Sequence, residues 1–288
     1  MKQLLYFILF NFLSIGTSLS QEKKHNPVNV PDEYLTQINV VYTRVNGWDG
    51  KMDLYTNPKA EAPTPIVINI HGGGWNHGEK ESQTGFGSWF KNGYAVANVA
   101  YRLVHIAPAP AAIEDVRCAL IYIIKNAKTL NIDTNKIVIM GASSGGHLAL
   151  MAGLLGSDNR FDYNCSYDEP IKVTAIINKY GVSDLAPLAT WKSAKNWLGT
   201  KYNDEHFVQS VSPIHYVNTQ SPSVFIIHGD ADPIVPYNQS TILYNALKAK
   251  GVKTEFITIQ DGAHGKFSTE QNEMISKQLW EFLNNLGL

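Results

Sequence analysis

The stretch KIVIMGASSGGHL, residues 136–148, constrains the fold of this chain more than any other feature. An apolar, β-branched run typical of a buried strand ends at Gly141, and a helical stretch begins at Ser144. Ser143 lies between them in the pattern Gly-x-Ser-x-Gly. A strand that turns sharply into a helix strains the backbone of its apex residue, and the residues two positions away must lack bulk. The sequence therefore predicts a strand, a tight turn with Ser143 at its apex, and a helix.

The rest of the chain alternates short apolar runs with longer amphipathic stretches, the order expected of a sheet covered by helices. Eight runs are predicted as strands: 38–45, 51–55, 65–70, 94–100, 136–140, 172–178, 223–229 and 254–259. Five stretches are predicted as helices: about 84–92, 111–130, 144–155, 238–250 and 269–286. The first two strands flank Asn-Gly and Asp-Gly pairs that suit a hairpin. The others are expected to be parallel, because helices connect them.

Composition is compatible with one large domain. The chain has 288 residues, of which 44% are hydrophobic and 17% are charged, enough apolar side chain for a sizeable core and too little charge for disorder. We expect a single domain over residues 32–288, with an insertion at about 183–222 that is long enough to cover a site. The formal net charge of -1 gives no electrostatic footprint for nucleic acid, which is not an expected partner.

The first residues have the pattern of a secretory signal peptide. Lys2 precedes an apolar stretch, Leu4–Gly16, and small residues follow it. We assign residues 1–20 to the signal peptide and residues 21–31 to a polar leader. A membrane anchor or a buried first helix is the alternative, but the interrupted run is short for a span of about 20 residues. The sequence predicts export, to the periplasm or the medium, and no membrane attachment after the signal is removed.

The chain has two cysteines, Cys118 and Cys165. Export would expose them to an oxidising compartment, but two thiols in a chain of this length are not a disulfide scaffold. The sequence leaves their pairing open, and we favour two unpaired thiols.

A serine hydroxyl at its ordinary pKa needs a base and an orienting carboxylate to act as a nucleophile. The loop after the seventh predicted strand offers Asp230 and Asp232, and the loop after the eighth offers His264. Of the nine histidines, only His264 follows the last strand in a loop able to reach the serine. The order Ser, Asp, His on loops that follow parallel strands is the one that hydrolases built on such a sheet use. We predict Ser143 as nucleophile and His264 as base.

The stretch HGGGW, residues 71–75, follows the third predicted strand directly. Glycines let the backbone approach a substrate closely enough for N–H groups to bind a developing negative charge. We predict Gly73, Gly74 and the backbone N–H of Ser144, at the start of a helix, as the oxyanion donors. The alternatives are an ordinary glycine loop at residues 71–75 and a flexible linker at residues 141–146.

Taken in chain order, HGGGW, GASSGG, DADPIVP and GAHG resemble the α/β-hydrolase superfamily over nearly the whole chain after the leader. HGGGW, YRL, the helix start APAPAAIEDVRCAL and GASSGGHLAL most resemble the carboxylesterases grouped with hormone-sensitive lipase and with bacterial feruloyl and acetyl xylan esterase-like enzymes. The hormone-sensitive lipase branch usually has Asp before the serine, where this chain has Ala142, so the turn is closer to the xylan-esterase-like pattern.

The resemblance implies an α/β-hydrolase fold, a mostly parallel eight-stranded sheet with helices on both faces and a small cap insertion after the sixth strand. It also implies a Ser-His-Asp carboxylic-ester hydrolase. The family places its acid before an x-x-Val-Pro turn, which implies Asp232, whereas Asp230 more simply bonds backbone N–H groups of the turn. The chain shows no metal-ligand spacing, phosphate loop or dinucleotide fingerprint, so we expect neither a metal nor a cofactor.

The substrate is less constrained by the sequence than the reaction. Three tryptophans are candidate substrate contacts, Trp75, Trp191 and Trp197, although aromatic residues at these spacings are also typical of a core. Export, the insertion and the xylan-esterase-like turn favour acetyl or hydroxycinnamoyl esters of plant polysaccharide or its fragments. A broad-specificity small-ester carboxylesterase, an arylformamidase-like amidase and a non-catalytic binding module stay open, as does the oligomeric state.

Overall fold

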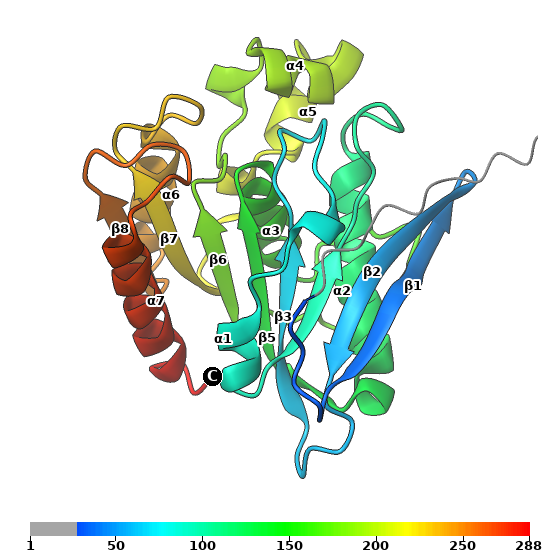
Figure 1. Ribbon diagram of the computed structural model, residues 1–288. Helices are drawn as coiled ribbons and strands as arrows, with labels where there is room; N and C mark the ends of the chain where they lie inside the picture. Colours follow the sequence, from blue (N-terminus) through cyan, green and yellow to red (C-terminus); the bar gives the residue numbers. More distant parts are fainter. Residues whose placement is uncertain (1–27) are drawn as a thin grey trace, which may run out of the picture.

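One sheet of eight strands forms the centre of the molecule, in the order β1-β2-β4-β3-β5-β6-β7-β8 (Figure 1). The computed structural model describes residues 28–288, so the predicted signal peptide and most of the polar leader lie outside the described residues. The strands are β1 (Leu35–Val45), β2 (Trp48–Thr56), β3 (Thr64–Ile70), β4 (Ala95–Val99), β5 (Ile132–Ala142), β6 (Ala175–Lys179), β7 (Ser223–Gly229) and β8 (Thr254–Ile259).

The pairing agrees with the sequence prediction of one hairpin and a parallel remainder. β1 pairs antiparallel with β2, and β2 pairs antiparallel with β4. All pairs among the strands β3 to β8 are parallel. Because parallel strands all end at the same edge of a sheet, the loops after β3, β5, β7 and β8 meet there.

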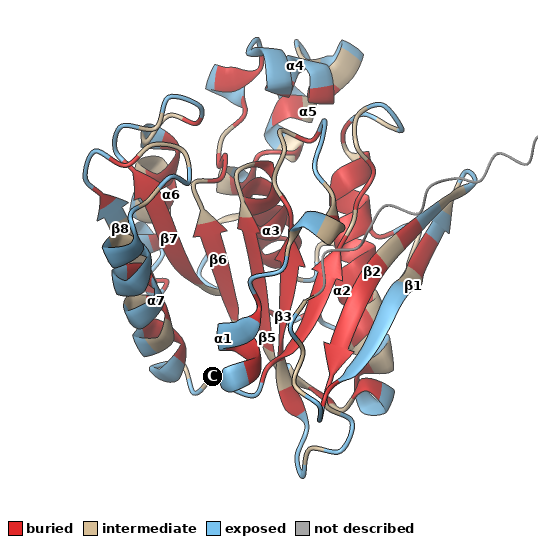
Figure 2. Cartoon of the chain, in the orientation of Figure 1, coloured by how far each residue is buried: buried red, intermediate tan, exposed pale blue. Residues whose placement is uncertain are grey.

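Helices cover both faces of the sheet. The helices α2 (Ala111–Leu130), α3 (Ser144–Leu154) and α6 (Asn238–Ala249) pack on one face, and α1 (Gly87–Lys91) and α7 (Thr269–Asn284) on the other (Figure 1). The central strands are therefore buried on both sides, as Figure 2 shows, which explains their continuous apolar runs. Within residues 28–288, no helix is both long enough and apolar enough to cross a bilayer.

Several predicted boundaries move by a few residues. β5 extends in both directions from the predicted 136–140, because it pairs with β3 from residue 132 onward and with β6 up to residue 142. β6 starts only at Ala175, where its pairing with β5 and β7 begins. Periodicity indicates which elements exist, whereas the neighbouring strands decide where each one starts.

The insertion (residues 183–222) consists of short helices joined by turns. Its helices are α4 (Lys192–Leu198) and α5 (Glu205–Ser210), and its 3₁₀ turns are η2 (Ala186–Leu188), η3 (Gly199–Lys201) and η4 (Pro213–Tyr216). A further 3₁₀ turn, η1 (Lys80–Ser82), follows the HGGGW stretch. In Figure 1, α4 and α5 lie above the carboxyl ends of the parallel strands. The insertion thus sits at the edge where the candidate side chains are expected.

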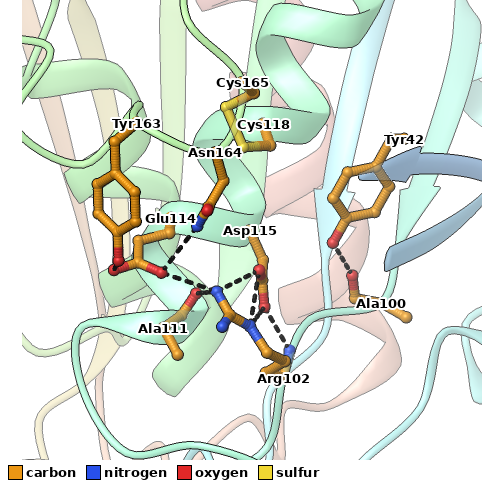
Figure 3. Close-up of polar contacts among 10 residues, drawn as sticks. All are labelled: Tyr42, Ala100, Arg102, Ala111, Glu114, Asp115, Cys118, Tyr163, Asn164 and Cys165. Carbon is orange, nitrogen blue, oxygen red and sulfur yellow. Dashed lines mark hydrogen bonds and ion pairs between the residues drawn. A yellow bond between two sulfur atoms is a disulfide. The ribbon is translucent and has the colours of Figure 1, made fainter. Parts of the chain in front are cut away.

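Cys118 and Cys165 form a disulfide, so the expectation of two unpaired thiols was wrong. Cys118 lies in α2 and Cys165 in the loop that follows α3, and their Cα atoms are 5.4 Å apart. A buried ion pair lies beside the disulfide: Arg102 bonds Glu114 and Asp115 at the start of α2, and Tyr163 and Asn164 bond Glu114 in turn (Figure 3). Packing of α3 against α2 brings Cys165 close to Cys118. The spacing of the two cysteines along the sequence does not reveal this packing.

We expect removal of the disulfide to destabilise the fold without altering the chemistry. The bridge links residues 47 positions apart, and closing a loop of that length lowers the entropy of the unfolded chain by an amount worth about 2–4 kcal/mol. The double variant Cys118→Ala, Cys165→Ala should therefore unfold at a lower denaturant concentration than the oxidised parent, and parent treated with dithiothreitol should match it. Coincident unfolding curves for all three samples would contradict the assignment.

Candidate active site

Ser143 occupies the tight turn between β5 and α3. Its φ of 54° and ψ of -123° lie in a region that residues with a side chain rarely adopt. The conformation is held from both sides, because the Ser143 N–H donates to the carbonyl of Lys179 at 2.9 Å and the Ser143 carbonyl accepts from the N–H of His147 at 3.1 Å. The strained apex that the sequence predicts is present in the structure.

The two glycines of the Gly-x-Ser-x-Gly pattern are required by close backbone contacts. A Cβ atom on Gly141 would lie 2.1 Å from the carbonyl oxygen of Gly145. A Cβ atom on Gly145 would lie 2.3 Å from the carbonyl oxygen of Ile70, at the end of β3. Both distances are far below van der Waals contact, so any other residue would force β5, α3 and β3 apart.

The HGGGW loop lies directly beside Ser143. Gly73 has a φ of 122°, and a Cβ atom there would lie 1.9 Å from the carbonyl oxygen of His77, so only glycine fits. Tyr101 supports the loop from behind: its hydroxyl donates to the carbonyl of His71 at 3.1 Å, and its ring stacks on the His71 ring at 4.3 Å. The predicted oxyanion residues Gly73, Gly74 and Ser144 all line one pocket together with Ser143.

His264 and Asp232 are in direct contact. His264, in the loop after β8, places Nδ1 2.6 Å from Oδ2 of Asp232, which follows β7. The other carboxylate oxygen, Oδ1, accepts hydrogen bonds from the N–H groups of Ile234 at 2.7 Å and Val235 at 3.0 Å. With Nδ1 bound to the carboxylate, the Nε2 atom of His264 is left for another partner. His264 lines the same pocket as Ser143.

The environment of Asp232 keeps it ionised. Burial alone would raise the pKa of this carboxyl, since its side chain is fully covered. The hydrogen bonds from Val235 and His264 outweigh burial, and the pKa of Asp232 lies below its usual range. A negative charge therefore faces His264 throughout the neutral pH range.

Asp230 has a different environment. It is exposed, and its Oδ1 accepts a hydrogen bond from the N–H of Asp261 at 2.7 Å, which ties the loop after β7 to the loop after β8. Asp232, and not Asp230, is therefore the aspartate that contacts His264.

Trp75 lines the pocket and is anchored through a buried histidine. Its Nε1–H donates to Nδ1 of His147 at 3.3 Å, and Nε2 of His147 lies 2.8 Å from the carbonyl of Val211 in the insertion. These two partners place the ring proton on Nε2. Burial lowers the pKa of His147 to about 4, so the ring is neutral. The HGGGW loop, the helix α3 and the insertion are thereby connected.

The three predicted substrate contacts differ in position. Trp191 is 46% exposed and, like Trp75, lines the pocket. Trp197 is completely buried and lies outside the pocket lining, so the expectation of a direct substrate contact is corrected. Its ring stacks on Trp75 with a centroid distance of 4.7 Å. Trp197 thus packs behind a pocket residue. The sequence could not distinguish this core position from a position that contacts a ligand.

Sequence reasoning did not predict the contacts that two further residues make with His264 and Asp232. Tyr180, after β6, has a φ of 44°, and its ring packs against the His264 ring at an interplanar angle of 61° with a centroid distance of 4.7 Å. His228, at the end of β7, is fully buried and places Nε2 3.1 Å from Oδ2 of Asp232. The pattern HGDAD, with a histidine four residues before the acid, is the sequence signal that could have indicated this second contact.

The pocket that joins these residues has a volume of about 620 Å³. Its walls are mainly apolar: Trp75, Val182, Leu188, Trp191, Ile234 and Val235. In residues 28–288, no group of three or more His, Cys, Asp or Glu side chains is arranged to hold a metal ion. The described geometry provides a serine hydroxyl, an imidazole paired with a carboxylate, and glycine backbone at one pocket.

Residues 52–247, more than half of the chain, match the BD-FAE family. The chain belongs to the BD-FAE family. The matched range starts in β2, includes Ser143 and Asp232, and ends in α6 before His264. Among curated relatives of this BD-FAE chain, Esterase LipQ of Mycobacterium tuberculosis is 28% identical over 272 residues, which cover 87% of the chain but 62% of LipQ.

Solved structures resemble the BD-FAE chain over most of its length. A truncated carbohydrate esterase from gut microbiota is 28% identical with a TM-score of 0.70, and the match covers 88% of this chain and 98% of that one. An acetyl ester-xyloside bifunctional hydrolase from Caldicellulosiruptor lactoaceticus is 27% identical with a TM-score of 0.72, covering 84% of this chain and 90% of that one. The predicted α/β-hydrolase fold is confirmed. The chain spans about 62% of the length of LipQ, and the relatives and solved structures named here are themselves called esterases or ester hydrolases.

We expect Asp232→Asn to fold like the parent and to lower kcat by about four orders of magnitude, because an amide would not hold His264 in the tautomer that accepts a proton. Asp230→Asn is the matched control: its Oδ1 can still accept from Asp261, and kcat should fall by less than about tenfold. Both are measured by hydrolysis of p-nitrophenyl acetate, with melting temperature as the check on folding. The reverse ranking would move the acid to Asp230.

Proposed function

We propose that this chain is an exported serine esterase that removes acetyl or hydroxycinnamoyl groups from plant polysaccharide or its fragments. Ser143 is the nucleophile, His264 the general base and Asp232 the acid that orients it. One observation carries the proposal: a serine held at a strained apex and a paired histidine line the same pocket as the HGGGW loop.

Acyl transfer to the serine is the first half of the reaction. Because Asp232 accepts a hydrogen bond from Nδ1–H of His264, Nε2 of the neutral ring is unprotonated. We propose that this nitrogen faces the Ser143 hydroxyl. As Ser143 Oγ attacks the ester carbonyl, Nε2 takes its proton, and the imidazolium then returns that proton to the departing alkoxide. The acyl group remains on Ser143 and the alcohol leaves.

Hydrolysis of the acyl-enzyme is the second half. Water enters the position of the alcohol, His264 takes a proton from it, and the carboxylic acid is released as the proton returns to Ser143. In both halves the backbone N–H groups of Gly73, Gly74 and Ser144 are proposed to hold the negative charge on the carbonyl oxygen. The loss of one such donor typically costs about 100- to 1,000-fold in rate.

The apolar pocket is proposed to hold the acyl group. Its aromatic wall, formed by Trp75 and Trp191, suits either a small acetyl group or the flat ring of a hydroxycinnamoyl group. A volume of about 620 Å³ leaves space for either acyl group. The contacts made by Trp75 and Trp191 would therefore decide which acyl group the enzyme prefers.

A second hollow of about 830 Å³, lined by side chains that carry polar groups, is proposed to hold the alcohol part of the substrate. It meets the apolar pocket at Lys192 and Ser193, which line both. Its other lining residues include hydroxyl, amide and aromatic side chains: Asn76, Asn196, Thr200 and Tyr202. Such side chains can bond and stack on sugar rings, and the relatives named carbohydrate esterase and acetyl ester-xyloside hydrolase support a sugar alcohol here.

Two features support export. The sequence of residues 1–20 has the pattern of a signal peptide. The disulfide between Cys118 and Cys165 suits an oxidising compartment, because such bridges are rare where thiols are kept reduced. A broad-specificity carboxylesterase is the second candidate function, favoured by the mainly apolar pocket and by the relative named as an esterase.

A fluorophosphonate probe tests the assignment of the nucleophile. The parent should be labelled covalently, because the activated Ser143 hydroxyl attacks the phosphorus, and Ser143→Ala should not be labelled. Ser144→Ala is the matched control: its proposed contribution comes from the backbone N–H, so labelling should persist. Labelling of Ser143→Ala would refute the assignment, and an unlabelled but folded parent would favour a binding module.

The two tryptophans of the insertion should behave differently when each is replaced by alanine. Trp191→Ala should change the ratio of kcat/KM between feruloylated or acetylated xylan fragments and p-nitrophenyl acetate by about tenfold, because Trp191 lines the pocket. Its melting temperature should change little, since the side chain is half exposed. The readout is a panel of esters together with thermal unfolding.

Trp197→Ala, in α4, is the comparison within the insertion. Removal of the buried indole should lower the free energy of unfolding by about 3–5 kcal/mol. The variant should lose activity to the same extent on every ester. Equal losses on all esters from Trp191→Ala, with a lowered melting temperature, would mean that the insertion does not select the substrate.

A further inference from the structure

The carboxylate of Asp232 contacts two histidines at the same oxygen. His264 Nδ1 lies 2.6 Å and His228 Nε2 3.1 Å from Oδ2. The two rings approach from different elements, His264 from the loop after β8 and His228 from the end of β7. Their exposure also differs, because the His264 side chain is 20% exposed and the His228 side chain is fully buried.

The partners of His228 determine which of its nitrogens carries the proton. Nε2 lies 3.1 Å from two acceptors, Oδ2 of Asp232 and the carbonyl oxygen of Val235, so Nε2 is the protonated nitrogen. Nδ1 lies 2.7 Å from the hydroxyl of Ser240, in α6, which can donate to it. His228 therefore has a donor on one side and acceptors on the other, and the neutral ring satisfies all of them.

The groups around His228 keep it neutral. Burial lowers its pKa, and neighbouring His264 acts in the same direction, against the opposite effect of Asp232. From the remaining elements packed on it, the rings of Tyr180 and Tyr237 pack against the His228 ring at interplanar angles of 61° and 67°. Burial and Asp232 raise the pKa of Tyr180, so this neighbour carries no charge near neutral pH.

We propose that His228 is a positioning residue that holds Asp232 in place and limits how strongly His264 retains its proton. The inference rests on the proposed function and adds a fourth member to the proposed triad. Oδ1 is held by the N–H groups of Ile234 and Val235, so the donor at Oδ2 fixes the remaining rotation of the carboxylate toward His264.

The shared oxygen has a chemical consequence for the reaction. A hydrogen bond from a neutral ring stabilises the negative charge on Asp232 and weakens its attraction for a proton on His264. The imidazolium formed when Ser143 attacks then releases its proton more readily to the departing alkoxide. Without His228, more negative charge would remain on the Asp232 oxygen that faces His264, and the imidazolium of His264 would hold its proton more strongly.

Three variants test the proposal on p-nitrophenyl acetate. His228→Leu removes the donor; kcat should fall about tenfold with little change in KM. The acid limb of kcat/KM, which reports the base in the free enzyme, should move upward by about half a pH unit to one unit. His228→Gln, whose amide N–H can reach the position of Nε2, should restore both values toward the parent. Ser240→Ala should cause a smaller change in the same direction.

The matched control is Leu243→Ala, which removes a buried side chain from the helix of Ser240 without touching Asp232. It should lower the melting temperature and leave the acid limb in place. An unmoved acid limb in folded His228→Leu, or in Ser240→Ala if the leucine variant does not fold, would overturn the proposal. So would a shift in Leu243→Ala of the same size.

Failure of this inference is distinguishable from failure of the proposed function. If Ser143→Ala or Asp232→Asn retains parental activity, the proposed triad itself is wrong. If both of those variants are inactive while His228→Leu keeps the parental kcat and acid limb, the triad stands and His228 is only a core residue.

Discussion

The strained backbone at Ser143 is the constraint on which the rest of the site depends. A positive φ at a residue with a side chain costs free energy, and it persists only where neighbouring structure enforces it. Here Gly141 and Gly145 let β5 and α3 approach so closely that a methyl group at either position would clash. The same approach brings α3 against the end of β3, and hence against the HGGGW loop. Backbone packing thus sets the positions of the proposed nucleophile and the proposed oxyanion donors together.

The insertion is coupled to this centre through buried aromatic contacts. Trp197 stacks on Trp75, and His147 connects Trp75 to the backbone of the insertion at Val211. A displacement of the insertion would therefore move Trp75, which follows the proposed oxyanion glycines directly in the sequence. The side of Trp75 that faces the pocket can contact an acyl group, while its other contacts hold the loop.

Local signals in the sequence were sufficient for the elements and the turn. Strand and helix periodicity, the glycine spacing around Ser143 and the loop positions of Asp232 and His264 all depend on residues close in the chain. The disulfide and the burial of Trp197 depend instead on how distant segments pack, which no spacing expresses. His228 shows both cases. Its position four residues before Asp232 is visible in the sequence, but only the structure shows that His228 and His264 contact the same oxygen of Asp232.

Burial separates the roles of the histidines around the site. His147 and His228 are each fixed between one donor and a backbone carbonyl, and burial lowers the pKa of both. His71, also buried, has a lowered pKa and stacks on Tyr101 behind the glycine loop. His264 differs because part of its ring reaches the pocket and its carboxylate partner lies on one nitrogen alone. Neutral buried rings supply fixed hydrogen bonds, which fits the proposal that His264 is the histidine that exchanges protons with substrate and water.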